Sequence, residues 1–455
     1  MRSHEIVESA LDRCSVDAMT VICQEHSSTN LRWASNTLTT NGVMRSRDVT
    51  VVAVSGGAAG VASASVADAD DLMGIVERAE AAARGADPAP DMADLVADRT
   101  TSDFTEGPAE TSPEVFSRFA PDLGDWFGRA RDDEHELFGF AEHDLTTTYL
   151  GNTAATRLRH VQPTGRLEVT GKSRQRTRST WVGRSTRDFS DIDVDELHGD
   201  VKTRLGWAER SLSLDPGRYE VLLPPSAVAD LLIYQYWTSA ARDAAEGRTV
   251  FSKPGGGTRL GDRLTDTQLT MLSDPHYPGI ECAPFVVAHA SGSTESVFDN
   301  GLPLERTAWI DKGELAALGQ TRHSLKLAGG SLTPMIDNLA LEVAGADASL
   351  DSLIASTDRG LLLTTLWYIR EVDPQTLLLT GITRDGVYLI ENGEVSGVVN
   401  NFRFNESPVD MLSRVTEASA THTALPREWN DFFTRVAMPT LRVADFNMST
   451  VSQAS

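Results

Sequence analysis

Cysteine is scarce in this sequence, with three residues in a chain of 455. Cys14, Cys23 and Cys282 are too few and too widely separated to form a disulfide framework or a cysteine-rich zinc site. The sequence therefore excludes both of these classes of protein.

Positive charge and long apolar runs are also scarce. The chain has 41 Lys and Arg against 65 Asp and Glu, a formal net charge of −24, which disfavours nonspecific attraction to nucleic acid or to anionic lipid. No apolar run approaches the length of a membrane span, and the first residues, MRSHEIVESALDR, are amphipathic and lack an apolar signal core. We therefore expect a cytoplasmic protein with no membrane partner and no direct nucleic-acid partner.

The usual catalytic motifs are missing as well. No GxSxG elbow occurs, and the glycine-rich loop KPGGGTRLGD (residues 253–262) lacks the GK[ST] of a phosphate-binding loop. In HELFGFAEH, which begins at His135, Gly139 stands where an HExxH motif needs its second histidine. Four further potential ligands have a spacing that matches no known metal site: His276, Glu281, Cys282 and His289. The motifs therefore assign no catalytic residue and no metal ligand to this chain.

What the sequence does contain is a series of helix and strand patterns in a composition typical of globular proteins, with 40% hydrophobic and 23% charged residues. The length predicts two or three domains. Residues 1–88 predict a helix, a β-meander and a second helix, because β-branched runs lie between two amphipathic segments, His4–Arg13 and Asp70–Arg84. The predicted strands are AMTVICQE, LRWAS, DVTVVAVS and GVASASV. This pattern indicates a small N-terminal α+β domain.

Residues 89–216 begin with an acidic linker rich in Pro and Gly. A helix near Glu114–Glu136 and several strands follow, so we expect a linker and a middle α/β segment. Residues 217–455 open with a helix and then read mainly as strands. The predicted fold class is α+β, with a large antiparallel β-rich C-terminal domain.

Turn residues support the antiparallel arrangement of that last domain. Asn392-Gly393 stands between two alternating runs in GVYLIENGEVSGVV, which predicts a type I′ hairpin turn. Asp373-Pro374 and Asp385-Gly386 mark two further turns between neighbouring strands.

One basic stretch, GKSRQRTRSTWVGR, places Arg174, Arg176 and Arg178 at alternate positions, ahead of Trp181. On a strand these arginines share one face and could hold an acidic peptide or a phosphate backbone. The favoured interpretation is a solvated strand face balanced by the nearby acidic stretch DFSDIDVDE.

Two segments are unusually polar for the elements that contain them. LLIYQYWTSAAR (residues 231–242) predicts a helix whose middle either lines a cavity or packs into a core, and VVNNFRFNESP (residues 398–408) places amides in a strand context that normally avoids Asn. The second segment is either a surface that binds peptide backbone or a tight polar corner. The candidate substrate-binding residues are Tyr234, Gln235, Trp237, Ser239, Asn400, Asn401, Arg403 and Asn405.

The order of these segments resembles the TldD/PmbA family, which includes proposed modulators of DNA gyrase and peptidase subunits. The first helix–meander–helix unit and TTYLGNTAATRLRHV (residues 147–161) are similar to its first two domains. The most specific similarities are C-terminal: SVFDNGLPLERTAWIDKGEL (residues 296–315), the long segment from DRGLLLTTLWYIREVD to NFRFNESP (residues 358–408) and MPTLRVADFNMS (residues 438–449).

In this family, TldD-type chains carry an HExxxH zinc motif on a helix of the C-terminal domain and a Cys ligand near the C-terminus. TldE/PmbA-type chains lack the motif and pair with a TldD chain, and together they process short unfolded peptides. Alignment of the paired leucines puts the motif on Ile233, Tyr234 and Thr238, or one residue later on Tyr234, Gln235 and Ser239. Neither register supplies a His or the Glu, and Cys282 is the last cysteine.

The resemblance therefore implies a TldE/PmbA-like subunit, a pseudoenzyme with no cofactor of its own, whose TldD-like paralogue supplies zinc. We expect a heterodimer formed through the C-terminal domain, with a homodimer as a lesser state, and an unfolded peptide held in extended form by strand addition. Two alternatives remain open. One is an autonomous metallohydrolase with unorthodox ligands such as His276, His289 and His323, and the other is a regulatory binding protein for gyrase that uses residues 174–187.

Overall fold

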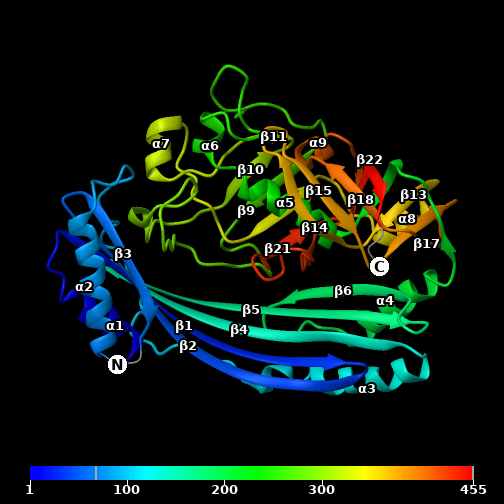
Figure 1. Cartoon of the computed structure of the whole chain (residues 1–455), viewed down its shortest axis with the longest axis horizontal. Helices are drawn as coiled ribbons and strands as arrows, with labels where there is room; N and C mark the ends of the chain where they lie inside the picture. The colour runs from blue at the N-terminus through cyan, green and yellow to red at the C-terminus, as the bar shows by residue number, and fades with distance from the viewer. Residues whose placement is uncertain (67–68, 453–455) are drawn as a thin grey trace.

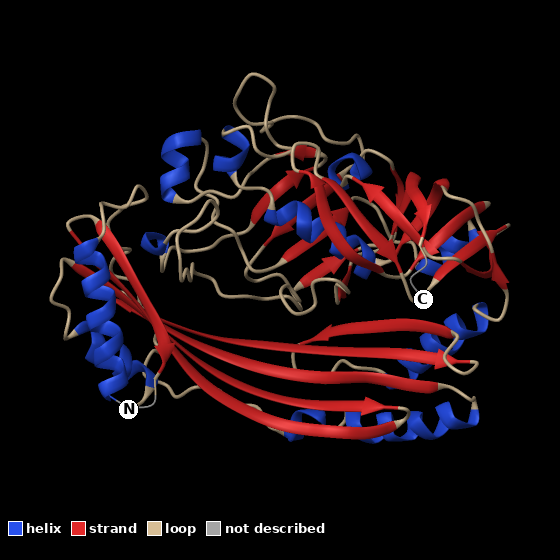
Figure 2. Ribbon diagram, viewed as in Figure 1, coloured by secondary structure: helices blue, strands red, loops and turns tan. Residues whose placement is uncertain are grey.

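The computed structural model describes residues 1–66 and 69–452, which form three β-sheets with helices on their faces (Figure 1). A six-stranded sheet from the N-terminal half lies opposite a C-terminal part built on a ten-stranded sheet and a second six-stranded sheet (Figure 2). The predicted α+β class is confirmed. Across the described ranges, no helix has both the length and the apolar character needed to cross a membrane.

The first sheet is entirely antiparallel, in the order β3-β2-β1-β4-β5-β6. Its two central strands pair from Thr20↔Asn152 to Trp33↔Gly139, so residues 1–88 and 89–216 contribute to one continuous sheet. AMTVICQE and LRWA lie within the single strand β1, and Ser35 begins the turn that follows it. The two predicted strands are one because the neighbours of β1 on both sides continue the ladder through the polar residues between them. The strands are β1 Ala18–Ala34, β2 Thr37–Ser55, β3 Ala58–Ser65, β4 Glu136–Asn152, β5 Arg157–Ser173 and β6 Arg178–Thr186.

Alternate side chains of these strands face two different layers, as the strand period of two requires. Val21 and Cys23 pack against the N-terminal helices, whereas Ile22 packs with Leu150 and Phe285 on the face toward the C-terminal part. In Figure 1, α1 and α2 lie at one end of the sheet and α3 lies beneath the other. The helices of this half are α1 Ser3–Leu11, α2 Ala69–Gly85, η1 Pro113–Phe116, α3 Phe119–Asp132 and α4 Val194–Trp207.

Two local predictions need correction. The helix expected near Glu114–Glu136 is a short 3-10 turn followed by α3, and Glu134 has a positive φ of 55° that ends the helix before β4 begins. The arginine stretch is also not a strand throughout. Arg174 and Arg176 have φ of 49° and 67° and lie in the turn between β5 and β6, so they do not share a strand face with Arg178.

The C-terminal part surrounds helix α5, Pro225–Trp237, with apolar side chains from both of its sheets. Its ten-stranded sheet contains β7 Ser211–Leu212, β8 Gly217–Leu223, β13 Arg359–Leu363, β14 Leu366–Asp373, β15 Leu378–Thr383, β16 Val387–Glu391, β17 Glu394–Val399, β18 Phe402–Glu406, β19 Val415–Ala418 and β22 Leu441–Val451. Its six-stranded sheet contains β9 Leu269–Ser273, β10 Thr307–Asp311, β11 Glu314–Leu315, β12 Leu339–Val343, β20 His422–Ala424 and β21 Val436–Met438. The remaining short helices are α6 Ala241–Ala245, η2 Val297–Asp299, α7 Arg322–Ala328, α8 Leu350–Ala355 and α9 Pro408–Leu412.

All three predicted turns lie between consecutive strands, and two of them close a hairpin. Asn392 and Gly393 have φ of 54° and 81° between the paired strands β16 and β17, as a type I′ turn requires, and Asp373-Pro374 joins the paired strands β14 and β15. Asp385-Gly386 is a turn but not a hairpin, because β15 pairs with β14 and β18 while β16 pairs with β13 and β17. Three pairs in this part are parallel, β7–β17, β8–β13 and β12–β21, so its sheets are mainly antiparallel rather than purely so.

Candidate functional site

Helix α5 is fixed in the core by a tyrosine whose hydroxyl satisfies the backbone of a neighbouring loop. Tyr236 is 1% exposed, donates a hydrogen bond to the carbonyl oxygen of Ile336 at 2.8 Å and accepts one from the backbone N–H of the same residue at 2.7 Å. Burial raises the pKa of this phenol well above its usual value, so it stays protonated. The helix therefore holds the loop around residues 334–337 in place.

A cluster of four aromatic side chains, Tyr234, Trp237, Trp429 and Phe433, covers the C-terminal turns of α5. Ring centroids lie 5.8 Å apart for Tyr234 and Trp429, 5.1 Å for Trp237 and Trp429, and 6.3 Å for Trp237 and Phe433. Trp429 also donates its indole N–H to the carbonyl oxygen of Asp230 at 2.8 Å. These contacts fasten the loop before β21 to the helix, and we call the four residues the aromatic cluster.

The other two candidate residues of this segment, Gln235 on α5 and Ser239 just after it, are buried. Gln235 is fully buried, and neither its amide nitrogen nor its amide oxygen has a hydrogen-bond partner among the described residues. Ser239 is 3% exposed and donates to the carbonyl oxygen of Tyr236 at 2.6 Å. Of the two interpretations of this helix, core packing describes both side chains.

The α5 positions do not fit the zinc ion that the resemblance implies for a catalytic chain. Zinc is bound by imidazole, thiolate or carboxylate groups, whereas the motif positions hold Ile233, Tyr234 and Thr238 in one register and Tyr234, Gln235 and Ser239 in the other. Thr238 donates its hydroxyl back to the carbonyl oxygen of Tyr234 at 3.2 Å. Within residues 1–66 and 69–452, no three His, Cys, Asp or Glu side chains come together in a group able to hold a metal ion.

The amide-rich segment at the start of β18 bonds mostly within its own sheet. Asn400 accepts a hydrogen bond from the backbone of Leu214 at 2.8 Å, Arg403 donates to Thr380 at 3.3 Å, and the carbonyl oxygen of Asn405 accepts from Asn447 at 3.2 Å. The side-chain oxygen of Asn401 accepts from Thr383 at 3.4 Å. These bonds describe a polar corner that ties neighbouring strands together, and the segment and the α5 residues do not meet in one cavity.

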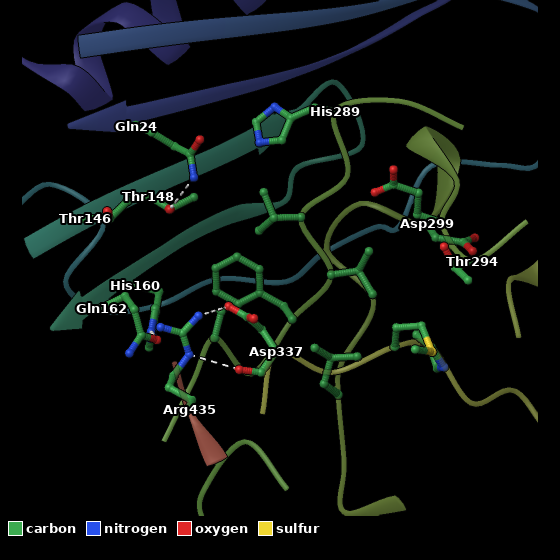
Figure 3. Close-up of a pocket in the computed structure, with 18 of the residues that line it drawn as sticks. Gln24, Thr146, Thr148, His160, Gln162, His289, Thr294, Asp299, Asp337 and Arg435 are labelled. Atoms are coloured by element: carbon green, nitrogen blue, oxygen red, sulfur yellow. Dashed lines mark hydrogen bonds and ion pairs between the residues drawn. The ribbon is translucent and has the colours of Figure 1, made fainter. Parts of the chain in front are cut away.

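A cavity of about 590 Å³ lies elsewhere, between the first sheet and loops of the C-terminal part (Figure 3). We call it the interdomain cavity. One wall is apolar and is formed by Ala283, Phe285, Val286, Val287, Leu304, Pro334 and Met335. Among the described residues that line it, none is one of the eight candidates predicted from the sequence. Helix α5 does not line the cavity but supports its wall, because Tyr236 bonds to Ile336, which lies between the lining residues Met335 and Asp337.

The floor of the cavity consists of polar side chains arranged in rows across β1, β4 and β5. The strand register places Gln24 beside Thr148 and His160, and the next row contains His26, Thr146 and Gln162. Asp144 and Thr164 continue the floor in a third row. Successive rows are two residues apart along each strand, which is roughly 7 Å in an extended chain.

Most floor and wall groups already have a hydrogen-bond partner. Gln24 donates to Thr148 at 3.2 Å, and His289 and Thr50 share a bond at 3.0 Å. Burial lowers the pKa of His160 and His289, which favours their neutral forms. Two carboxylates of the lining form ion pairs, Asp299 with Arg322 at 2.6 Å and Asp337 with Arg435.

Unlike Asp299 and Asp337, the Asp144 carboxylate has no bonding partner in the described part of the lining. It has no hydrogen bond or ion pair among the described residues, and its side chain is half-buried in the floor. Burial, with the nearby charge of Glu142 as a second cause, raises the pKa of this carboxyl to about 6. Arg166, which lies nearby, is already held by Glu142 at 2.6 Å and by Asp431.

The other residues considered from the sequence are dispersed. Arg176 pairs with Glu136 at 2.6 Å, so its partner is the start of β4 rather than the acidic stretch at 188–196. Burial raises the pKa of the Cys282 thiol to about 12, which keeps it protonated. The potential ligands His276, Glu281, Cys282, His289 and His323 form no metal-binding group among the described residues.

Comparisons with known proteins agree on the family. The model of the PmbA/TldA metallopeptidase C-terminal domain matches residues 216–450, and that of the PmbA/TldA metallopeptidase domain 1 matches residues 20–83. No curated protein sequence matches the chain.

Solved structures show the same fold at low sequence identity. TldE from Thermococcus kodakarensis superposes with a TM-score of 0.79 at 14% identity, covering 97% of this chain and 98% of its own. A candidate modulator of a DNA gyrase from Thermotoga maritima gives a TM-score of 0.74 at 14% identity, with 94% and 95% covered. A second candidate gyrase modulator, from Bacteroides thetaiotaomicron, gives 0.75 at 14% identity, with 98% of each chain covered. Since the C-terminal family model alone spans more than half of the residues, this chain belongs to the PmbA/TldD metallopeptidase family.

Proposed function

We propose that this chain is the non-zinc, TldE/PmbA-like subunit of a two-chain metallopeptidase that processes short unfolded peptides. In this proposal the chain contributes a peptide-binding cavity, and a TldD-like paralogue that carries HExxxH contributes the zinc ion and the hydrolytic chemistry. The complex is a heterodimer in the cytoplasm, and a homodimer forms when the partner is missing. The chain by itself is a pseudoenzyme.

The observation that carries the proposal is the packing of α5. In either register, the positions of the family's zinc motif hold side chains that cannot replace two histidines and a glutamate as zinc ligands and general base. Tyr234 is committed to the aromatic cluster, Gln235 and Ser239 are buried, and Thr238 bonds to its own helix. A hydrolytic metal at this place would require several substitutions and removal of the Trp429 contact.

The interdomain cavity supports the proposal that this chain binds a peptide. Its floor presents hydroxyl, amide and imidazole groups that can exchange hydrogen bonds with a peptide backbone, and the opposite loops add apolar side chains beside polar ones such as His289 and Thr294. A volume of about 590 Å³ is within the range of sites that bind small molecules or short peptide segments. Polar groups along one side and apolar contacts along the other suit an extended peptide of variable sequence.

Co-expression with the HExxxH-bearing paralogue of the same genome tests this function. We expect the two chains to co-purify, and we expect cleavage of an unfolded peptide by the complex but not by this chain alone. A partner in which the two motif histidines are changed to alanine is the matched control, and it should retain the complex but lose cleavage. If the chains do not associate and their mixture cleaves nothing, the proposed function is wrong.

A further inference from the structure

The carboxylate of Asp144 has a different environment from the other acidic groups of the interdomain cavity. Asp299 and Asp337 each face an arginine, and Glu295 is exposed at the rim. Asp144 lies in the floor between β1 and β5, and no described side chain or backbone group bonds to its oxygens. A partly desolvated carboxylate without a partner is unfavourable for the folded chain. A ligand with a positive charge would supply the missing partner.

The chemistry of the surroundings favours an ammonium group over a metal ion. Divalent cations take several oxygen or nitrogen ligands, and no three His, Cys, Asp or Glu side chains of the described ranges converge on one point. An ammonium group has three N–H donors. Besides Asp144, the floor has hydroxyl oxygens at Thr164, directly opposite on β5, and at Thr146, two residues along β4. Thr164 already accepts a hydrogen bond from Arg435 at 3.0 Å, and Thr146 shares one with His26 at 3.1 Å. A hydroxyl oxygen has two lone pairs, so each can accept a second bond.

The rows of the floor give the direction of the rest of the ligand. From Asp144 the next two rows present Gln162 and then Gln24, at the roughly 7 Å interval that two residues of an extended peptide span. Carboxamide side chains both donate and accept hydrogen bonds, as a peptide backbone requires. Gln24 now donates to Thr148, and Gln162 bonds to His160 and to the carbonyl oxygens of Pro163 and Glu281, so a bound peptide would exchange with these bonds. The apolar side chains of the lining, among them Phe285, Leu304 and Met335, can cover the side chains of such a peptide.

We propose that Asp144 binds the ammonium group of an extended peptide, with the following residues of that peptide lying along the Gln162 and Gln24 rows. The ammonium group comes either from a free amino terminus or from a lysine side chain, because the two present the same cation to the carboxylate. This inference rests on the proposed peptide-binding function of the cavity. It adds that the cavity selects peptides with a positively charged ammonium group at the position of Asp144.

Peptide titrations of the full-length chain, alone and in complex with its HExxxH-bearing paralogue, test this inference. The probes are a fluorescent hexapeptide with a free amino terminus and one lysine, its N-acetylated form, and the form with norleucine in place of lysine. Removal of the relevant charge should weaken binding about tenfold, as expected for one charge-assisted hydrogen bond. Loss upon acetylation identifies the amino terminus as the source, and loss upon norleucine substitution identifies the side chain.

The variant Asp144→Asn should bind the charged and uncharged probes equally. The matched control is Glu136→Gln, since Glu136 is on the same strand but pairs with Arg176 and does not line the cavity; this variant should keep the full discrimination. Two results would overturn the inference. One is an Asp144→Asn variant that still binds the charged probe more tightly than the uncharged probes. The other is a wild-type chain that binds all three probes equally, both alone and in complex with the paralogue. Association with the paralogue, measured by gel filtration, should be unchanged in Asp144→Asn, so that a failure of the ammonium site is distinguishable from a failure of the subunit assignment.

Discussion

Helix α5 and the floor of the interdomain cavity are both rich in polar side chains, but the fold uses them in opposite ways. On α5 the polar groups are buried or covered, as with Gln235 at 0% exposure and Tyr234 under Trp429. On the floor, similar groups such as Gln24 and Gln162 face a cavity of about 590 Å³. Polar composition alone therefore does not mark a site; the layer that packs against an element decides whether its polar groups are available.

The two regions are also connected physically. Tyr236 on α5 bonds to both backbone groups of Ile336, and the next residue, Asp337, lines the cavity with its partner Arg435. Helix α5 therefore serves as the support of a wall, which explains why it can be well packed while the cavity remains open.

The aromatic cluster provides the largest expected effect in this comparison. Trp429→Ala removes two ring contacts and an indole hydrogen bond from α5, and we expect the free energy of unfolding to fall by about 3 kcal/mol. Phe432→Ala is the matched control, because that ring is 75% exposed and its loss should change stability by less than about 0.5 kcal/mol. Urea denaturation measures both. Equal effects of the two variants would mean that the cluster does not hold the helix.

A smaller effect is expected from the hydroxyl that links the helix to the cavity wall. Tyr236→Phe leaves the N–H and C=O of Ile336 without this partner in a buried position, so we expect a loss of about 2 kcal/mol. Tyr368→Phe, at a tyrosine that is 58% exposed, is the control. Hydrogen exchange should also rise in residues 334–337 in the first variant only. Unchanged exchange there would mean that the helix does not hold the cavity wall in place.

Replacement of the buried amide should act in the opposite direction. Because neither amide atom of Gln235 has a hydrogen-bond partner among the described residues, Gln235→Met keeps the volume and removes the desolvation penalty. We expect the free energy of unfolding to rise by about 1.5 kcal/mol. A lower stability in thermal denaturation would indicate that the amide has a role that packing does not reveal.

The smallest expected effect concerns the floor. The pKa of Asp144 in the folded chain, about 6, lies above the ordinary value of 3.8. The folded chain therefore binds this proton more tightly than the unfolded chain does, and the stability that the proton contributes is present at pH 4 and is lost as the pH rises through 6. Asp144→Asn should therefore raise stability at pH 7 by about 1 kcal/mol, a value discounted because the carboxyl is only half-buried, and should change little at pH 4. Melting temperatures at both pH values measure this, and a variant less stable at pH 7 would contradict it.

Local patterns predicted the elements of this molecule better than they predicted its site. Asn392-Gly393 marks a hairpin because the turn depends on the backbone of two adjacent residues. Pro225 is the first residue of α5, a position where proline needs no backbone N–H. Arg174 and Arg176 were assigned to a strand because alternation alone does not reveal a turn that needs positive φ.

The cavity floor could not be found in the same way. Gln24, Thr148 and His160 become neighbours only when β1 pairs with β4 across more than a hundred residues of chain. The one signal in the sequence is that polar residues continue at even positions of β1, at Gln24 and His26, where a core strand would be apolar. The wall opposite comes from residues 283–304 and 334–337, which no local pattern connects to the sheet.

The central claim is that this chain contributes a binding cavity and its paralogue contributes the metal. Zinc analysis of the purified complex, followed by separation of the two chains and analysis of each, tests it most directly. We predict one zinc ion for each HExxxH-bearing chain and no retained zinc in this chain, whether it is purified from the complex or expressed alone. Stoichiometric zinc in the isolated chain, lost upon substitution of His276, His289 or His323, would contradict the account and favour an autonomous metallohydrolase.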